Sequence, residues 1–456
     1  MTTINVPLII NGQEEHLSST FDVISPYTNE PCWTSSSASP QDAIRAVEAA
    51  DAAFPAWSQT KPAARRDVLL KTADLLEQRL EQNAEYMRTE MGADVGASQG
   101  FVVPLAIRML REVASRITSI CGSVPVVEAE GQSAMVFKEP MGVILGIVPW
   151  NAPYVFGIRS AACALAAGNT TILKSSELTP AATGPLAAPS RMQVSPLHPA
   201  VRKINFTGST AVGRKIARSC GQNLKPCLME LGGKNSSIVC KDADLTTAVQ
   251  GVLAGAFLNS GQICMATDRI LVHSSIAPTF IPALQKALAA GADTSALPPT
   301  LVNTASKTRV EALISSAVEA GAHFISGSAD AKLPAGSGVR MAPAILGGVK
   351  EEMPVWQEES FASVAACMTF ESEEEAIRLA NGSGYGLSAS VFTEDLRRGL
   401  AMAKKIQSGA VHINSMTIHD EPVLPHGGVK NSGWGRFNAE EGLNEFLSTK
   451  SVTWMD

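Results

Sequence analysis

Residues 257–266 read FLNSGQICMA, and the rest of the chain is organised around this stretch. Upstream, apolar residues between Leu245 and Phe257 recur at helical spacing, whereas Ile270–Val272 form the continuous apolar run of a buried strand. Cys264 therefore lies on a turn between a helix and a strand, where a ligand can reach its thiol. Free cysteines often only fill space, and this stretch alone leaves that alternative equally open.

A second motif, ELGGKN at residues 230–235, places the carboxylate of Glu230 on a Gly-rich turn. A thiol becomes a strong nucleophile as the thiolate, and a positioned carboxylate can take the proton of the thiol or of a water molecule. ELGGKN followed by FxNxGQxC resembles the aldehyde dehydrogenase superfamily, and the two motifs together are highly specific. The resemblance covers nearly the whole chain, from Asn11-Gly12 to the final strand.

The composition indicates a globular protein of two or three domains. Its 456 residues are 45% hydrophobic, which is enough to bury substantial cores. A net charge of −6 and a pI near 5.8 give no reason to expect nucleic acid as a partner. The eight cysteines form no CxxC pair, so we expect reduced thiols. None of the seven histidines lies at metal-ligand spacing from a cysteine, so we expect no metal site. No secretory signal and no membrane-spanning apolar run is visible, so the expected location is the cytoplasm.

From Met141 the sequence alternates between apolar strands and helices, which predicts a doubly wound parallel sheet. The expected strands are 143–148, 170–173, 203–206 and one ending near 230, and the expected helices are 156–167, 181–188 and 210–220. A second α/β domain should follow over 235–418, with strands at 236–240, 270–273 and 390–393 and helices at 245–258, 308–319 and 396–406. Ligands of such sheets bind at the carboxyl ends of strands, where the segments PWN (149–151), KSSE (174–177) and TGST (207–210) all fall.

The chain before this alternation is expected to hold short strands and helices. Asn11-Gly12 is a hairpin signal, and helices should begin at Pro40 and Pro62 and run from 102 to 117. Residues 123–139 become extended and partly polar, which predicts a protruding hairpin.

The resemblance implies an α/β architecture, the aldehyde dehydrogenase-like fold, with two doubly wound α/β domains plus a small β oligomerisation arm. It divides the chain into an NAD-binding domain (1–121 and 141–232), a catalytic domain (233–418), the arm (122–140 and 443–456) and a Gly-rich segment (419–442) that closes back on the cofactor domain. The implied partners are a small-molecule aldehyde and other copies of the chain, as a homodimer or homotetramer.

The cofactor site is expected along the strand ends of the first sheet. No GxGxxG occurs, and GSTAVGR at 208–214 has the glycine spacing of a P-loop without its Lys-Ser/Thr, so a nucleoside triphosphatase is a weak alternative. A Gly-Ser-Thr turn that opens a helix offers N–H groups to a phosphate, although it is equally a plain capped helix.

Lys174 and Glu177 can bind ribose hydroxyls or form an exposed ion pair. By the resemblance, this carboxylate disfavours a 2′-phosphate, so NAD is expected rather than NADP. The implied cofactor contacts are Ile147, Pro149, Trp150, Lys174, Glu177, Gly208, Ser209, Val212, Leu231, Gly232, Glu359 and Phe361.

Residues 357–364, QEESFASV, resemble the family segment EEIFGPV. The resemblance implies that Glu359 holds the nicotinamide ribose and that Phe361 supports the nicotinamide ring. This chain has Ala362 and Ser363 where the family has Gly-Pro, so ordinary residues replace a stiff, tight turn beside Glu359.

The resemblance also implies the catalytic roles. Cys264 attacks the aldehyde carbon, Glu230 activates the water that hydrolyses the thioester, and Asn151 stabilises the oxyanion together with the Cys264 N–H group. An ordinary turn asparagine is the alternative for Asn151.

HDEP at 419–422 with PHGGVKNSGWGRFN at 425–438 resembles the branch of the family that oxidises aromatic aldehydes, such as salicylaldehyde and vanillin. The substrate contacts expected from this are Tyr154, Arg159, Leu258, Met265 and Met416. Ordinary core positions are the alternative for the apolar ones, and a surface salt bridge is the alternative for Arg159. We assign His426 no catalytic role.

The interval between Glu177 and Phe206 is shorter than the family usually carries. It holds one short helical piece, and the two prolines of residues 188–196 discourage regular structure after it. We therefore expect a shortened cofactor domain over 178–205. The alternative function is a cofactor-impaired relative of the same fold, with weak or no turnover.

Overall fold

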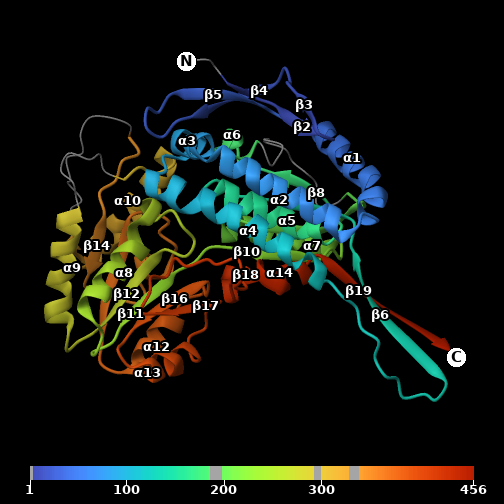
Figure 1. Ribbon diagram of the computed structural model, residues 1–456. Helices are drawn as coiled ribbons and strands as arrows, with labels where there is room; N and C mark the ends of the chain where they lie inside the picture. The colour runs from blue at the N-terminus through green and yellow to red at the C-terminus, as the bar shows by residue number, and fades with distance from the viewer. Residues whose placement is uncertain (1–3, 185–197, 292–298, 328–337) are drawn as a thin grey trace.

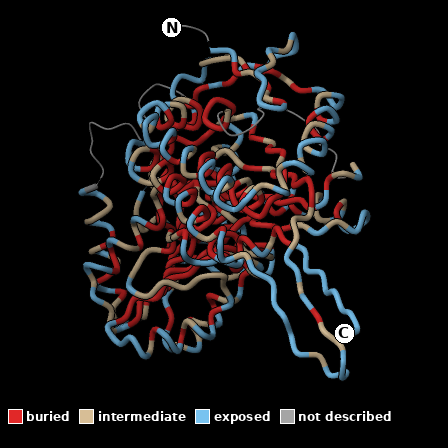
Figure 2. The backbone as a smooth tube through the Cα atoms, turned by 45° about the vertical axis from the view of Figure 1, so that its right-hand side comes forward, coloured by how far each residue is buried: buried red, intermediate tan, exposed pale blue. Residues whose placement is uncertain are grey.

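The computed structural model describes residues 4–184, 198–291, 299–327 and 338–456 (Figure 1). Two large sheets with helices packed around them form the body, and a two-stranded ribbon projects from it. The backbone of the body is largely buried at its centre, whereas the projecting ribbon is mostly exposed (Figure 2). No helix within these ranges is long and apolar enough to cross a membrane.

The first large sheet has the strand order β18-β10-β9-β7-β8. Its bounds are β7 Val143–Ile147, β8 Thr170–Lys174, β9 Val201–Thr207, β10 Cys227–Glu230 and β18 Gly433–Trp434. The pairings among β7, β8, β9 and β10 are parallel, as the alternation predicts. The expectation of a purely parallel sheet is wrong at one edge, because β18 runs antiparallel to β10. A two-residue strand is too short to show any periodicity in the sequence.

Both faces of this sheet are covered by helices. Val143 and Leu145 pack with α1 (Pro40–Ser58) and the end of α7 (Thr210–Gln222), whereas Ile144 packs in a separate cluster on the other face. That second cluster is formed by the helices α2 Pro62–Gln78, α3 Leu80–Met91, α4 Val103–Arg116 and α5 Pro153–Ala166. The continuous apolar sequence of β7 follows from this burial on two faces.

The second large sheet has the order β13-β14-β15-β12-β11-β16-β17. Its bounds are β11 Asn235–Val239, β12 Thr267–His273, β13 His323–Ser326, β14 Ala344–Gly347, β15 Val364–Phe370, β16 Ser388–Phe392 and β17 Ala410–Ile413. All pairings are parallel except that of β13 with β14. The helices around it are α8 Leu245–Phe257, α9 Ala277–Gly291, α10 Thr304–Glu319, α12 Glu373–Asn381 and α13 Leu396–Ala403.

The projecting ribbon pairs β6 (Gln132–Pro140) with β19 (Leu447–Met455) in antiparallel register along nine residues. The predicted hairpin within 123–139 is therefore wrong, since a strand from the other end of the chain is the partner of β6. Only a single bridge, Ser123 to Val136, joins the preceding segment to β6. No local pattern pairs these two strands, but the arm implied by the family resemblance, 122–140 with 443–456, contains both of them.

The N-terminal part forms two small sheets, β1-β5-β4 and β2-β3. Asn11 and Gly12 join β2 to β3 with φ of 51° and 73°, which confirms the hairpin signal. The bounds are β1 Asn5–Val6, β2 Leu8–Ile10, β3 Gln13–Glu15, β4 Thr20–Ile24 and β5 Pro31–Ser36.

The shortened interval is only partly described. The helix expected over 181–188 is observed as the single turn α6 (Pro180–Thr183). The rest of that helix and the proline-containing stretch 188–196 lie outside the described residues. Among the described strands, β8 forms the edge of its sheet on this side.

Candidate active site

The thiol of Cys264 follows a turn of unusual backbone geometry. After α8, the one-turn helix η3 (Leu258–Gly261) holds Asn259, Ser260 and Gly261 at φ of 51°, 59° and 69°. A Cβ on Gly261 would lie 2.2 Å from the carbonyl oxygen of Ala362, so only glycine fits there. Consecutive left-handed residues persist only where surrounding contacts enforce them, and they often occur at functional sites.

Two buried amide side chains supply these contacts. Gln262 accepts from the Val302 N–H group at 2.8 Å and donates to the Thr300 carbonyl at 3.2 Å. Asn235, the last residue of ELGGKN, donates to the carbonyl oxygens of Cys264 and Ala266, both at 2.8 Å. The sequence motifs contain both amides, but the holding role of each becomes visible only in the fold.

The carboxylate of Glu230 lies against the thiol. Cys264 Sγ donates to Glu230 Oε1 at 3.1 Å, and both side chains are buried. Burial raises the pKa of the Cys264 thiol well above its ordinary value, and the negative charge of Glu230 raises it further. The resting thiol is therefore protonated, and the carboxylate beside it is placed to take its proton.

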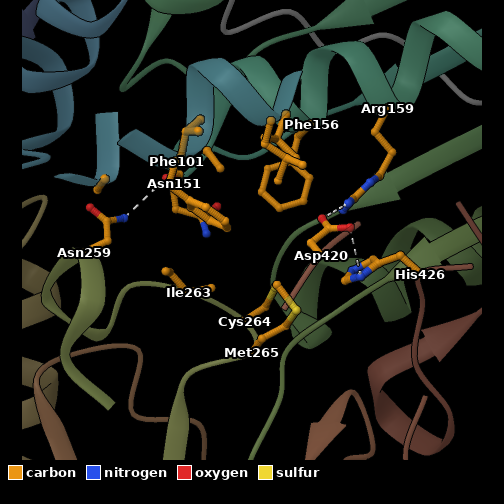
Figure 3. Close-up of a pocket in the computed structure, with 15 residues that line it drawn as sticks. Phe101, Asn151, Phe156, Arg159, Asn259, Ile263, Cys264, Met265, Asp420 and His426 are labelled. Atoms are coloured by element: carbon orange, nitrogen blue, oxygen red, sulfur yellow. Dashed lines mark hydrogen bonds and ion pairs between the residues drawn. The ribbon is translucent and has the colours of Figure 1, made fainter. Parts of the chain in front are cut away.

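Asn151 joins this group from the loop between β7 and α5. Its Nδ2 donates to the Gln262 carbonyl at 3.0 Å, and its backbone carbonyl accepts from Asn259 at 3.4 Å. An amide nitrogen carries two hydrogens, so Asn151 can donate the second one to a ligand. The side chain lines the same pocket as Cys264 (Figure 3).

A charged cluster lies behind Glu230. Arg159 on α5 is only 4% exposed, so the alternative of a surface salt bridge is wrong. Its guanidinium forms an ion pair with Asp420 and lies 3.5 Å from Glu230 Oε2. The guanidinium also lies 5.5 Å from the ring centres of Phe156 and Phe437, which shield the pair from water. A guanidinium engaged in this way is held rigidly.

His426 and Asp420 complete the cluster. His426 Nε2 is 3.7 Å from Glu230 Oε1, and its Nδ1 is 3.9 Å from Asp420 Oδ1. Asn438 donates to Asp420 at 2.9 Å and fixes that carboxylate. Burial raises the pKa of Glu230, but His426 and Arg159 lower it by more, so its pKa lies below the ordinary value. The motifs HDEP and PHGG contain Asp420 and His426, and sequence reasoning missed their place beside the base.

The pocket above Cys264 is mainly apolar and narrow. Phe101 and Phe156 reach into it from above in the view of Figure 3, and Asp420 and His426 close one side. The cavity volume is about 30 Å³, which holds water but no aromatic ring. Its lining residues are Ala97, Phe101, Val102, Leu105, Asn151, Ala152, Val155, Phe156, Arg159, Asn259, Ile263, Cys264, Met265, Asp420 and His426.

The predicted substrate contacts divide into two groups. Arg159 and Met265 line this pocket. Tyr154 does not, because it points to the opposite side of α5 and donates to Asn83 at 3.2 Å within the core. Leu258 and Met416 are absent from the lining and pack with the apolar residues beside Cys264. Phe101, Val155 and Phe156 line the pocket instead, and their helical positions gave no distinctive sequence signal.

The predicted cofactor residues gather at the carboxyl ends of β7, β8 and β9. Ile147 is the last residue of β7, Pro149 and Trp150 follow it, and Gly208 and Ser209 follow β9. Ser209 caps the 13-residue helix α7 through its side chain, which accepts from the Val212 N–H group, and leaves that helix start facing the strand ends. Lys174 lies 3.7 Å from Glu177, whose side chain is 50% exposed.

The segment around Glu359 faces this region from the second sheet. Glu359 accepts from the Gly233 N–H group at 3.0 Å, and a Cβ on Gly232 would lie 2.5 Å from its carboxylate. Phe361, at φ 50°, contacts the Trp150 ring edge-on at a centroid distance of 5.7 Å. Leu231 lies on the same turn, where its N–H donates to Ser432. These contacts bring the Glu359 segment of the second sheet against Trp150 and the turn at residues 231–233.

Comparisons with known proteins agree on one family. The model of the aldehyde dehydrogenase family matches residues 13–189 and 193–452. Vanillin dehydrogenase from Pseudomonas fluorescens is 40% identical over 482 aligned residues, covering 99% of this chain and 98% of that protein. A salicylaldehyde dehydrogenase from Pseudomonas putida G7, solved with salicylaldehyde, superposes with a TM-score of 0.91 at 33% identity, covering 99% and 98%. PnpE in complex with nicotinamide adenine dinucleotide superposes with a TM-score of 0.93 at 32% identity, covering 100% and 98%.

Proposed function

The chain belongs to the aldehyde dehydrogenase family and is an oxidoreductase that acts on aldehydes. We propose that it oxidises an aromatic aldehyde to the carboxylic acid with NAD, through Cys264. The observation that carries the proposal is the hydrogen bond of 3.1 Å from the Cys264 thiol to the Glu230 carboxylate, next to the amide of Asn151. There a nucleophile and an oxyanion donor line one buried pocket, and a base is hydrogen-bonded to the nucleophile.

In the first step, the Cys264 thiol gives its proton to Glu230 as the sulfur bonds to the aldehyde carbon. The carbonyl electron pair moves to oxygen, where the Asn151 side chain and the Cys264 N–H group donate hydrogen bonds to it. Loss of such a donor typically costs about 3 kcal/mol of barrier. Bound NAD would supply the hydride acceptor for the thiohemiacetal carbon, and Cys264 would then hold the product as a thioester.

Before the second step, Glu230 releases the thiol proton to solvent. It then takes a proton from water as the water oxygen attacks the thioester carbon. Cys264 leaves as the thiolate and takes that proton from Glu230, and the acid is released. The position of Glu230 Oε1, 3.1 Å from the Cys264 sulfur that would carry the thioester, supports this role. The pocket that Cys264 lines has a cavity volume of about 30 Å³, which is enough for a water molecule.

The described residues fit a dinucleotide. The start of α7 offers backbone N–H groups to the pyrophosphate, Lys174 and Glu177 can bind one ribose, and Glu359 can bind the other. Gly232 leaves close-approach space beside Glu359 that no larger residue permits. We favour NAD over NADP because the Glu177 carboxylate would repel a 2′-phosphate.

The aromatic substrate class rests on the pocket and on the relatives. Phe101, Phe156 and Met265 give the pocket apolar walls of the kind that bind a ring. The named relatives act on vanillin and salicylaldehyde.

The test is NADH absorbance with the purified protein, NAD and a set of aldehydes. We expect turnover of benzaldehyde and 2-hydroxybenzaldehyde, and faster turnover of these than of butanal at equal concentration. Cys264→Ala should abolish it while leaving the fold and NAD affinity largely intact. Near wild-type activity in that variant contradicts the mechanism, and preference for butanal contradicts the substrate class.

One observation favours a second candidate, a cofactor-impaired relative with weak or no turnover. The interval that follows β8 is short, and β8 is an edge strand among the described residues. A protein that binds NAD weakly and produces no NADH with any aldehyde would fit this alternative.

A further inference from the structure

The polar cluster behind Glu230 combines groups from separate parts of the chain. Arg159 comes from α5, Glu230 ends β10, and Asp420 and His426 come from the loop between β17 and β18. All four are less than 10% exposed. Burying so many ionisable groups carries a large desolvation penalty unless they compensate one another. Such a cluster is expected to serve a purpose beyond packing.

The imidazole of His426 lies between two carboxylates. Its Nε2 faces Glu230 and its Nδ1 faces Asp420, at 3.7 and 3.9 Å. Neither contact is a hydrogen bond in this state, and His426 Nε2 and Glu230 Oε2 have no hydrogen-bond partner among the described residues. A movement of about 0.5–1 Å would bring either ring nitrogen within hydrogen-bond range. After such a movement the ring could form a hydrogen bond to either carboxylate.

Charge balance points in the same direction. Asp420 and Glu230 bring two negative charges and Arg159 one positive charge, so a protonated His426 makes the cluster neutral. His426 and Arg159 lower the pKa of Glu230 against the effect of burial, and Arg159 and His426 act on Asp420 in the same sense.

Three other titratable groups, Cys264, Glu359 and His412, lie near Glu230 or His426. Cys264 donates to Glu230, and Glu359 adds to the negative charge that raises the pKa of Cys264. His412 on β17 faces His419 and His426, and burial with these neighbours lowers its pKa to about 4. A neutral His412 adds no positive charge beside His426 and does not contribute to the charge balance of the cluster.

We propose that His426, held by Asp420, is a positioning residue for aldehyde oxidation: it turns the Glu230 carboxylate toward Cys264 and keeps it ionised as the base. The proposal rests on the proposed function, in which Glu230 takes a proton from the thiol and then from water. In a variant without His426, the buried Glu230 carboxylate has only the positive charge of Arg159 beside it. Glu230 should then stay protonated to a higher pH than in the wild type.

The direct test measures the thiol and needs neither cofactor nor aldehyde. Cys264 is alkylated with iodoacetamide from pH 5 to 10, and the rate is followed on its peptide by mass spectrometry. Glu230 assists alkylation only while ionised. In His426→Phe we expect a rate at pH 6 lower than wild type on the order of tenfold, approaching wild type at high pH. His426→Gln keeps an N–H donor without the charge and should fall between the two.

Two controls make the result interpretable. His273→Gln removes a histidine from the far end of β12, where the ring contacts Ser275, and should leave the profile unchanged. Glu230→Gln should slow alkylation at low and neutral pH, and adding His426→Phe to it should cause no further change. Profiles of the His426 variants that coincide with wild type overturn the proposal. A loss of equal size at every pH overturns it too, since that is the signature of damaged packing.

Turnover then gives a second readout. The acid limb of kcat against pH should move to higher pH in His426→Phe, with KM for the aldehyde nearly unchanged, and imidazole added to His426→Ala should restore part of the rate at pH 6. No rescue together with an unmoved acid limb counts against the proposal. If the wild type oxidises no aldehyde, the proposed function fails, while the alkylation profile still decides the role of His426.

Discussion

At the scale of single residues, the turn that carries Cys264 does not make its thiol reactive. Burial and the neighbouring Glu230 charge raise the pKa of the thiol, so the thiolate is scarce in the resting protein. Reactivity must come from proton transfer at the moment of attack, across the 3.1 Å contact to Glu230. The same carboxylate is needed again to activate water for hydrolysis of the thioester. Attack on the aldehyde and hydrolysis of the thioester can therefore be measured separately.

We expect Glu230→Gln to slow the second step more than the first. Mixing the variant with NAD and benzaldehyde should give a burst of NADH followed by a slow steady state. Hydrolysis of the thioester needs a base for water, whereas a small thiolate fraction still allows attack. Stopped-flow absorbance measures both phases. Loss of the burst in proportion to the steady state would instead assign Glu230 an equal role in attack.

For Arg159 we predict a loss of turnover that is the same for different aromatic aldehydes. Its guanidinium is engaged by Asp420 and Glu230, so Arg159→Ala leaves two buried carboxylates without their cation. Breaking such a pair typically destabilises a protein by about 3–5 kcal/mol. We expect a lower unfolding midpoint and equal losses of turnover with 2-hydroxybenzaldehyde and benzaldehyde. A loss confined to the hydroxylated substrate would show a direct contact between Arg159 and the phenol.

At the scale of elements, sequence reasoning succeeds where the signal is local. The apolar run 143–148 is observed as β7, and the Ser39-Pro40 start of α1 forms a capping box. Local patterns fail where the partner is distant, as for β18, and they did not pair β6 with β19, although the arm implied by the family resemblance contains both strands.

The candidate site shows the same division. Cys264, Glu230 and Asn151 lie in recognisable motifs; Cys264 and Asn151 line one pocket, and Glu230 accepts a hydrogen bond from Cys264. Tyr154 was misplaced because adjacent residues on a helix face different directions, so that Val155 and Phe156 reach the pocket while Tyr154 packs against Asn83. The partner of a buried charge is equally invisible in a sequence, which is why the position of His426 could not be foreseen.

The edge strand β8 leads to a prediction about the cofactor. An apolar groove lined by residues that include Ile9, Ile10, Leu165 and Ile172 runs beside β8, where no further described strand pairs with it. If the adenine loses about 100 Å² of apolar cover, binding weakens by about 2.5 kcal/mol, or nearly two decades. We expect a Kd for NAD well above micromolar. Calorimetry that yields a low-micromolar Kd would contradict this.

At the scale of the whole molecule, the ribbon of β6 and β19 indicates self-association. An isolated pair of strands is marginally stable in water, yet this one exposes Phe137 and Trp454, at 43% and 40% (Figure 2). We expect the protein to be a dimer or tetramer in light scattering after gel filtration, with these side chains at the contact.

The double variant Phe137→Asp, Trp454→Asp should reduce the mass to that of a monomer. Leu224→Asp is the matched control, because it removes an apolar side chain that is 93% exposed elsewhere and should leave the assembly intact. A monomeric wild type, or an unchanged mass in the double variant, would show that the ribbon does not join subunits.

The two strands of this ribbon are synthesised at different times. Glu139 and Ser448, which are hydrogen-bonded neighbours across the two strands, are separated by 309 residues of chain. A ribosome needs roughly 15–60 s to make that length, so β6 emerges and waits for its partner throughout that time. During the wait its unpaired edge and the side chains of Met135 and Phe137 are open to other nascent chains. The last strand to be made is thus the one that protects the ribbon, and slow elongation near residue 446 should favour aggregation over assembly.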